Sequence, residues 1–63
     1  MNVPEYWEKQ AYHYTAGWEF AEDCWNDEEP FDTDFFADHL ESSVEREAYQ
    51  AGYYAFWKSK GIE

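Results

Sequence analysis

The sequence predicts an all-α fold, a small helical hairpin with two long helices, or with three if the second arm breaks near Ser42. Two observations predict it. Along two long stretches, apolar residues recur at steps of three and four, the spacing of one helix face. The period-two alternation typical of half-buried strands is missing from the sequence. With 63 residues and no internal linker, residues 1–63 are expected to form one small helical domain.

The first helix is expected to run from Pro4 to Trp25. Asn2 can cap it, with Pro4 in the first turn and Glu5 three residues after the cap. Pro30 disfavours helix at the residue before it, so a loop is expected after Trp25. The apolar stripe that predicts this helix consists of Trp7, Ala11, Tyr14, Trp18, Ala21 and Trp25.

A second helical series follows the loop. Ser42 and Glu45 form a capping box, so residues 33–40 are either a separate short helix capped by Asp32 or Thr33, or part of one long helix. The last helix is expected to end near Lys60, where Gly61 can adopt the left-handed cap conformation. Its predicted face is Phe36, Leu40, Val44, Ala48, Ala51 and Ala55, with Tyr49, Tyr53 and Phe56 beside it.

Both arms contain the pattern Tyr-x-Ala-Gly-aromatic, at residues 14–18 and at residues 49–53. Glycine within a helix costs about 1 kcal/mol relative to alanine. Its presence in the middle of both arms predicts that the helices cross closely at Gly17 and Gly52, with the neighbouring aromatic rings packed over the gap. Chance similarity in a chain rich in alanine and tyrosine is the alternative.

This order of features resembles the ribosome modulation factor family, small bacterial proteins with a glycine-containing helix, a Pro-aromatic turn and a second helix reading aromatic-x-x-Gly-aromatic. The matching residues are Ala16-Gly17, Pro30-Phe31 and residues 49–53, within a span of about residues 8–57. The resemblance implies a related helical pair and an association with ribosomes. Members of that family are basic and bind ribosomal RNA, whereas this chain has four Lys plus Arg against fifteen acidic residues.

The acidic residues are concentrated in the middle of the chain. Twelve of the fifteen lie between Glu19 and Glu47, where Arg46 is the only base, so this segment carries the full net charge of −11. Such a segment repels nucleic acid and anionic membranes and attracts basic surfaces. The residues expected to bind a partner are Glu19, Glu22, Asp23, Asp27, Glu28, Glu29, Asp32, Asp34, Asp38, Glu41 and Glu45.

A solvated face that keeps an aromatic-rich chain soluble is the alternative explanation of these acids. The acids at the end of the first helix argue against it, because there they oppose the helix macrodipole by a few tenths of a kcal/mol each. If the arms fold back on each other, the end of the first helix, the loop and the start of the next arm are expected to meet at one acidic tip. Four aromatic residues outside the main stripes are expected to face a partner there or elsewhere: Tyr6, Tyr12, Tyr54 and Trp57.

Metal binding and catalysis are not expected. The acidic loop lacks the central glycine and the twelfth-position Glu of an EF-hand, and His13 and His39 have no partner at metal-ligand spacing. Cys24 lies beside Asp23, whose charge raises the pKa of a thiol and so opposes nucleophilic use. We expect a protein that is not an enzyme and carries no metal and no cofactor.

In size and acidity the chain resembles phage-encoded inhibitors that imitate nucleic acid, such as anti-CRISPR and anti-restriction proteins. That resemblance implies a small inhibitor that occupies the basic groove of a nucleic-acid-binding protein or complex. The expected partner is therefore a basic protein and neither nucleic acid nor a membrane. A ribosome-associated hibernation factor is the alternative, and the aromatic surplus leaves a homodimer open. With one thiol and no signal peptide or spanning segment, a cytoplasmic location is expected, in a bacterial host cell if the chain is phage-encoded.

Overall fold

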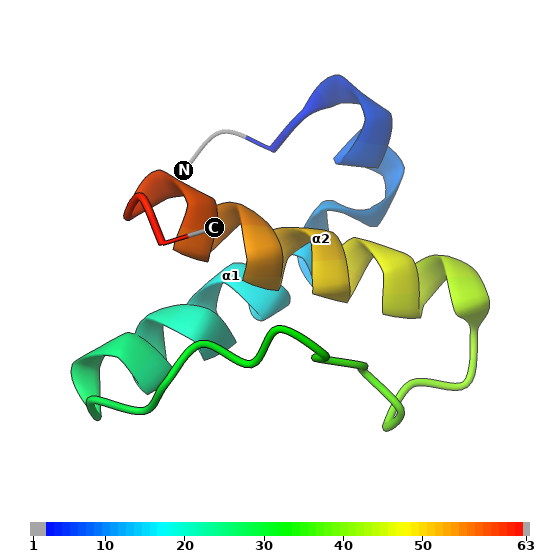
Figure 1. The fold of residues 1–63 in the computed structure, drawn as a ribbon. Coiled ribbons are helices and arrows are strands. Elements are labelled where there is room, and N and C mark those ends of the chain that lie inside the picture. Colours follow the sequence, from blue (N-terminus) through cyan, green and yellow to red (C-terminus); the bar gives the residue numbers. More distant parts are fainter. Residues whose placement is uncertain (1–2, 63) are drawn as a thin grey trace.

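The computed structural model describes residues 3–62, and in that range the chain forms one short 3₁₀ helix and two long α-helices. The 3₁₀ helix η1 spans Glu5–Gln10, α1 spans Ala11–Asn26 and α2 spans Ser43–Ser59 (Figure 1). The two α-helices pack against each other, and η1 contacts both. The predicted all-α class with two long helices is confirmed. The expected cap at Asn2 lies outside the described residues.

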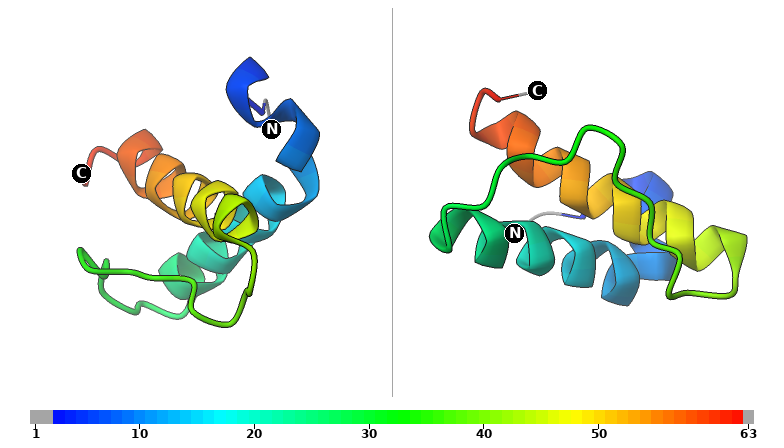
Figure 2. Two further views of the ribbon diagram at one scale, coloured as in Figure 1. Left: turned by 90° about the vertical axis from the view of Figure 1, so that its right-hand side faces the viewer. Right: turned by 60° about the horizontal axis from the view of Figure 1, so that its bottom comes forward.

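The two α-helices run in similar directions. His13 near the start of α1 contacts Glu45 near the start of α2, and at the other end Trp25 contacts Trp57. Residues 27–42, called here the connecting segment, therefore leave the end of α1 and travel back along the helix pair to the start of α2 (Figure 2). The arms therefore do not fold back on each other as an antiparallel hairpin requires, because the connecting segment spans the whole length of the helices.

The helices cross where the two mid-helix glycines lie. A methyl group at Gly17 would overlap the carbonyl oxygen of Tyr49, and one at Gly52 would overlap the carbonyl oxygen of Tyr14. Backbone therefore lies directly on backbone, and only hydrogen in place of a side chain permits that approach. The Trp18 ring packs edge-on against Phe56 beside the crossing, with ring centroids 5.4 Å apart.

The core is built mainly from aromatic rings of α2 against small residues of α1. Its buried cluster is Ala21, Cys24, Tyr53, Phe56 and Trp57, with Trp18, Phe31, Phe35 and Tyr54 packed against it. Phe35 stacks on Tyr53 with centroids 4.0 Å apart, the closest ring pair described. Because the rings supply most of the buried area, a chain this short can bury a core without a disulfide.

The predicted apolar face of the second arm is wrong in part. Val44 of the predicted face is exposed. Tyr53 and Phe56, which were expected beside that face, lie in the core. The buried residues of α2 are Ala48, Gly52, Tyr53, Phe56 and Trp57. Aromatic rings bury more area than the alanines one position away, and this sets the rotation of the helix.

The short helix considered for residues 33–40 does not form. The described backbone there makes tight turns, with Asp38 N donating to Phe36 O at 2.9 Å and Leu40 N to Ala37 O at 3.3 Å. Phe35 and Ala37 turn inward while Phe36 remains exposed, an arrangement that one helical stripe cannot provide. Tertiary packing overrides the local helical pattern.

The caps predicted for the last helix, at Ser42 and Gly61, are confirmed. Ser42 is the N-cap of α2 and accepts a hydrogen bond from Glu45 N, and Gly61 takes a positive φ of 75°. Ile62 N then donates to Trp57 O at 3.1 Å, which completes a Schellman motif. Before α1, the chain forms 3₁₀ turns instead of the expected α-helix, and Gln10 at φ −120° separates the two.

Candidate functional site

The acids predicted to bind a partner are almost all on the surface. Glu45 is half-buried, and the other ten are exposed. They form two sets. The α1 carboxylates are Glu19, Glu22 and Asp23, which share one helix face because they are three and four positions apart. The segment carboxylates lie on the connecting segment and are Asp27, Glu28, Glu29, Asp32, Asp34, Asp38 and Glu41.

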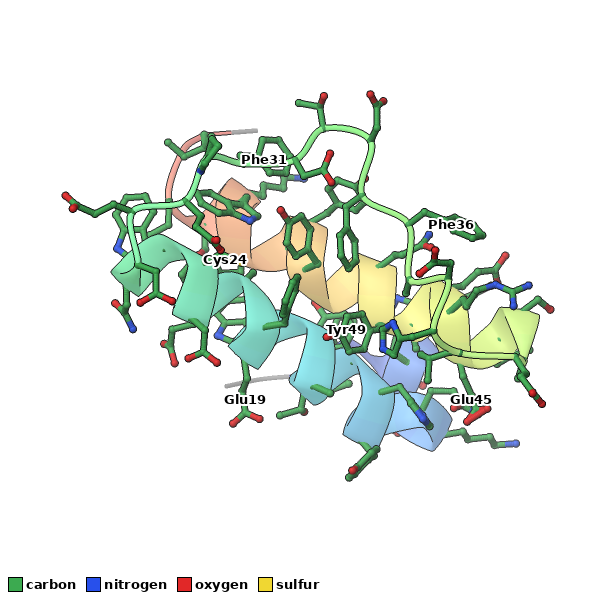
Figure 3. All side chains as sticks on the ribbon, turned by 90° about the horizontal axis from the view of Figure 1, so that it is seen from below. Glu19, Cys24, Phe31, Phe36, Glu45 and Tyr49 are labelled. Carbon is green, nitrogen blue, oxygen red and sulfur yellow. The ribbon has the colours of Figure 1, made fainter. Side chains whose placement is uncertain are left out.

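The two sets do not meet at one tip. The connecting segment runs the length of the molecule, so its carboxylates are distributed from the end of α1 to the start of α2 (Figure 2). Figure 3 shows Glu19 pointing away from the connecting segment, on the opposite side of α1, while Glu45 lies at the far end beside α2. The expected single acidic tip is therefore replaced by an elongated acidic surface.

Side chains of α2 hold the connecting segment in place. The Tyr53 hydroxyl accepts a hydrogen bond from Asp32 N at 3.0 Å, and the Tyr54 hydroxyl donates to Phe35 O at 3.0 Å. Further along, Gln50 Oε1 accepts from Ala37 N at 3.0 Å. Three separate positions of the segment are thus tied to one helix, which satisfies backbone groups that have no helical partner.

Aromatic side chains of the segment reinforce these hydrogen bonds. Phe31 packs against Trp57 with centroids 5.3 Å apart, and Phe35 stacks on Tyr53. The intervening Asp32 and Asp34 face solvent, and Asp32 Oδ1 accepts from Asp34 N at 2.9 Å in an Asx turn. The segment therefore presents carboxylates outward from a backbone that is anchored from below.

The basic residues leave these carboxylates largely unpaired. Among residues 3–62 the one close contact between a basic side chain and a carboxylate joins His13 Nε2 to Glu45 Oε2 at 3.1 Å. The Arg46 guanidinium instead donates to the carbonyl oxygens of Leu40 and Glu41, at 2.7 and 2.8 Å. Lys60 lies over the Trp25 ring, 5.3 Å from its centroid. The negative charge of the segment is thus not cancelled by the described part of the chain.

An aromatic cleft lies between α1 and the connecting segment, with a volume of about 430 Å³. Rings form much of its wall, and two carboxylate-bearing residues belong to the same lining. The lining residues are Phe20, Cys24, Glu29, Pro30, Asp32, Phe35, Phe36 and Tyr53. Phe20 is 40 % exposed and Phe36 60 % exposed, so both rings are accessible from solvent.

The thiol in this cleft is a neutral group. Burial, followed by a hydrogen bond to Glu29 and the nearby charges of Glu29, Asp27 and Asp23, raises the pKa of Cys24 to about 11. A thiol with such a pKa holds its proton at neutral pH and is a poor nucleophile. The raised pKa has the direction expected from the neighbouring Asp23, with burial as its largest cause.

The end of α1 contains an unusual backbone conformation. Glu28 has a positive φ of 60°, and the hydrogen bonds Glu28 N to Trp25 O and Glu29 N to Cys24 O make a Schellman motif around it. Glycine is the usual residue at this position, because any Cβ is crowded in the left-handed region. A glutamate here gives up local stability and adds one carboxylate to the acidic surface.

The aromatic residues expected to face a partner are divided by the structure. Tyr6 and Tyr12 are each 82 % exposed, whereas Trp57 is 3 % exposed and lies in the core. Tyr54 is half-buried and uses its hydroxyl to hold the connecting segment. The expectation for Trp57 is wrong because α2 turns its aromatic row inward.

Sequence reasoning missed the exposed ring of Phe20. Its position, four residues before Cys24 and adjacent to the predicted stripe, is the signal that could have placed it at the edge of the core.

Two properties of residues 3–62 bear on the kind of site. The described residues contain no group of three or more His, Cys, Asp or Glu side chains placed to hold a metal ion. In the same range, neither α-helix is long and apolar enough to cross a membrane.

Comparison of the chain with protein-family models, with curated proteins and with solved structures finds no match in any of the three.

Proposed function

We propose that this protein is a small acidic inhibitor that binds a basic nucleic-acid-binding protein or complex and occupies its groove. One observation carries the proposal: the connecting segment is tied to α2 by three side-chain hydrogen bonds while its carboxylates remain exposed and largely unpaired. A fixed row of negative charge loses little conformational entropy on binding, and it accelerates encounter with a basic surface.

The mechanism is competitive occupation. Carboxylates on the outer face of α1 are about 5–6 Å apart at Cβ, and they extend the charge of the segment around the helix. A protein of net charge −11 is repelled by phosphates, so it acts on the protein and not on the nucleic acid. This is the mode of action of nucleic-acid mimics of the anti-CRISPR or anti-restriction type.

Affinity capture from a bacterial lysate tests the proposal. The bait is compared with a segment variant, D27N/E29Q/D32N/D34N, and bound proteins are eluted with rising salt and identified by mass spectrometry. The native chain is expected to retain a basic nucleic-acid-binding protein at low salt and to release it at high salt. The segment variant is expected not to retain that protein. Amides keep the Asx-turn acceptor at residue 32, so the fold is preserved.

A matched control separates total charge from position. The variant E19Q/E22Q/D23N removes three charges from α1 without touching the connecting segment. The proposal predicts that it weakens capture less than the segment variant. The mechanism is contradicted if the segment variant retains the same partner and releases it at the same salt concentration as the native chain.

A second proposal is a ribosome-associated factor of the ribosome modulation factor type, which contacts a basic ribosomal protein. The glycine crossing and the stacking of Phe31 on Tyr53 support it, because they join the three features on which that resemblance rests. Sedimentation of a lysate through a sucrose gradient tests it. Co-migration with ribosomes that survives high salt favours this factor over the inhibitor, and a chain found only in light fractions rejects it.

A further inference from the structure

We propose that the aromatic cleft between α1 and the connecting segment receives an arginine side chain of the partner. The inference rests on the proposed function, whose partner is basic, and adds the group that is recognised and the place where it docks. The cleft combines accessible rings with Glu29 and Asp32 in one lining. A planar cation stacks on a ring and bonds carboxylates at the same time, which no apolar or anionic side chain can do.

The chain's own cations use the same chemistry at two neighbouring places. The Arg46 guanidinium lies over the Phe36 ring, 5.7 Å from its centroid, and Lys60 lies 5.3 Å from the centroids of Trp25 and Phe56. Within residues 3–62, no Lys or Arg lies over the Phe20 ring. The described chain thus places its own Arg46 over Phe36, which also lines the cleft, and leaves the Phe20 ring of the same cleft for a partner.

The backbone that carries the two acidic residues of the cleft lining is held in position, and so is the Asp32 carboxylate. Glu29 follows the left-handed residue of the α1 cap, and its N–H donates to Cys24 O at 2.9 Å. Asp32 is fixed twice, by the bond from its N–H to the Tyr53 hydroxyl and by its Asx turn. Groups ordered before binding lose less entropy when a cation arrives.

Arginine is favoured over lysine by geometry. The guanidinium is flat, carries five donors in a fixed fork and is less strongly hydrated than an ammonium, so it stacks on a phenylalanine face at a smaller desolvation cost. A volume of about 430 Å³ suits one long side chain and lies at the low end of ligand pockets, which span about 300–1,000 Å³.

The test is an NMR titration of the full ¹⁵N-labelled chain with N-acetylarginine amide at low salt. Its neutral isostere N-acetylcitrulline amide and N-acetyllysine amide are titrated in parallel. The proposal predicts amide shifts concentrated at the cleft, in the order arginine, then lysine, with citrulline giving almost none. The variant E29Q/D32N is expected to lower arginine affinity about fivefold or more, as the loss of two exposed ion pairs requires.

Two variants control this measurement. E22Q/D23N removes the same charge from the outer face of α1 and is expected to change arginine affinity by less than about twofold. Phe20→Leu keeps the bulk of the wall but removes the π face, and is expected to lower arginine affinity about threefold. The ¹⁵N spectrum of each variant reports directly whether the native fold is kept.

Three results overturn the inference: shifts spread evenly over both carboxylate sets, citrulline binding as well as arginine, or equal losses in E29Q/D32N and E22Q/D23N. Lysine binding as well as arginine overturns the preference for a planar cation. Each of these leaves the proposed function intact, because charge without a defined cleft suffices for it. A different pair of results separates the two proposals the other way. If arginine binds in the cleft but capture of partners from lysate does not depend on salt, the inference is supported and the proposed function is rejected.

Discussion

The helix crossing and the connecting segment are stabilised in opposite ways. At the crossing, backbone contacts backbone over Gly17 and Gly52, and an added methyl has no room. In the connecting segment, a backbone without helical hydrogen bonds is attached by side chains of α2 and by two inward rings. This small protein therefore tolerates change unevenly: the crossing determines whether it folds, and the outer surface of the segment is free to carry charge.

The largest expected effect is at the crossing. Gly17→Ala places a methyl against the Tyr49 carbonyl, so the helices must separate, and we expect the free energy of unfolding to fall by about 3 kcal/mol or more. Thermal unfolding followed by circular dichroism measures it. Ala16→Gly, one residue away, is the control and is expected to cost only about 1 kcal/mol. If the Gly17→Ala variant melts within a few degrees of the native chain, the crossing is not tightly packed.

Detaching the connecting segment is expected to have the next largest effect. Phe35→Ala removes the ring that stacks on Tyr53, and because Phe35 is half-buried we expect a loss of about 2–3 kcal/mol, below that of a fully buried ring. Hydrogen exchange should then rise at Asp32 and Ala37 more than in α1. Phe36→Ala, on an exposed ring, is the control. Equal losses from both variants would show that the segment is not anchored by its inward residues.

Alkaline pH is expected to destabilise the fold through Cys24, the buried thiol of α1. The folded chain holds the Cys24 proton more tightly than the unfolded chain, because its pKa is raised to about 11. The contribution of this thiol to the free energy of unfolding is therefore constant below the pKa of the unfolded thiol. It falls as pH rises above that pKa, by about 1 kcal/mol from about pH 8 to about pH 10. Urea unfolding across this range measures the slope. Cys24→Ser does not titrate there and should reduce the slope, and an unchanged slope would assign the effect to the tyrosines.

The smallest expected effect is a gain. Glu28→Gly relieves the left-handed backbone strain at the α1 cap, and we expect an increase in stability of about 1 kcal/mol. Glu28→Gln removes the same charge but keeps the Cβ, and so separates strain from electrostatics. Equal unfolding temperatures for the two variants would mean that φ at residue 28 carries no cost.

The sequence predicted the helices better than the connection. Periodicity located both helices, and the Ser42 and Gly61 caps were found because capping depends on a few neighbouring residues. The connecting segment escaped prediction because its backbone partners, Tyr53, Gln50 and Tyr54, are 13 to 21 positions away. The similar direction of the helices escaped as well, since helical periodicity contains no information on the course of a loop.

The candidate site was predicted in composition and not in shape. Charge is read directly from the residues, and all but Glu45 of the acids expected on the surface are exposed. Their distribution along the molecule depends on the course of the connecting segment, so a single tip was expected where an elongated surface exists. The aromatic cleft arises from the same course, because it brings Asp32 and Phe35 beside Phe20.

We propose that the exposed carboxylates serve binding and are not needed for folding. One chain, E22Q/D23N/E28Q/E29Q, tests it when its unfolding temperature and its capture of a basic partner from lysate are both measured against the native chain. We expect the variant to unfold at the same temperature as the native chain or higher, because self-repulsion is reduced. We also expect it to lose most of the salt-sensitive capture of the basic partner. A lower unfolding temperature with undiminished capture would contradict it.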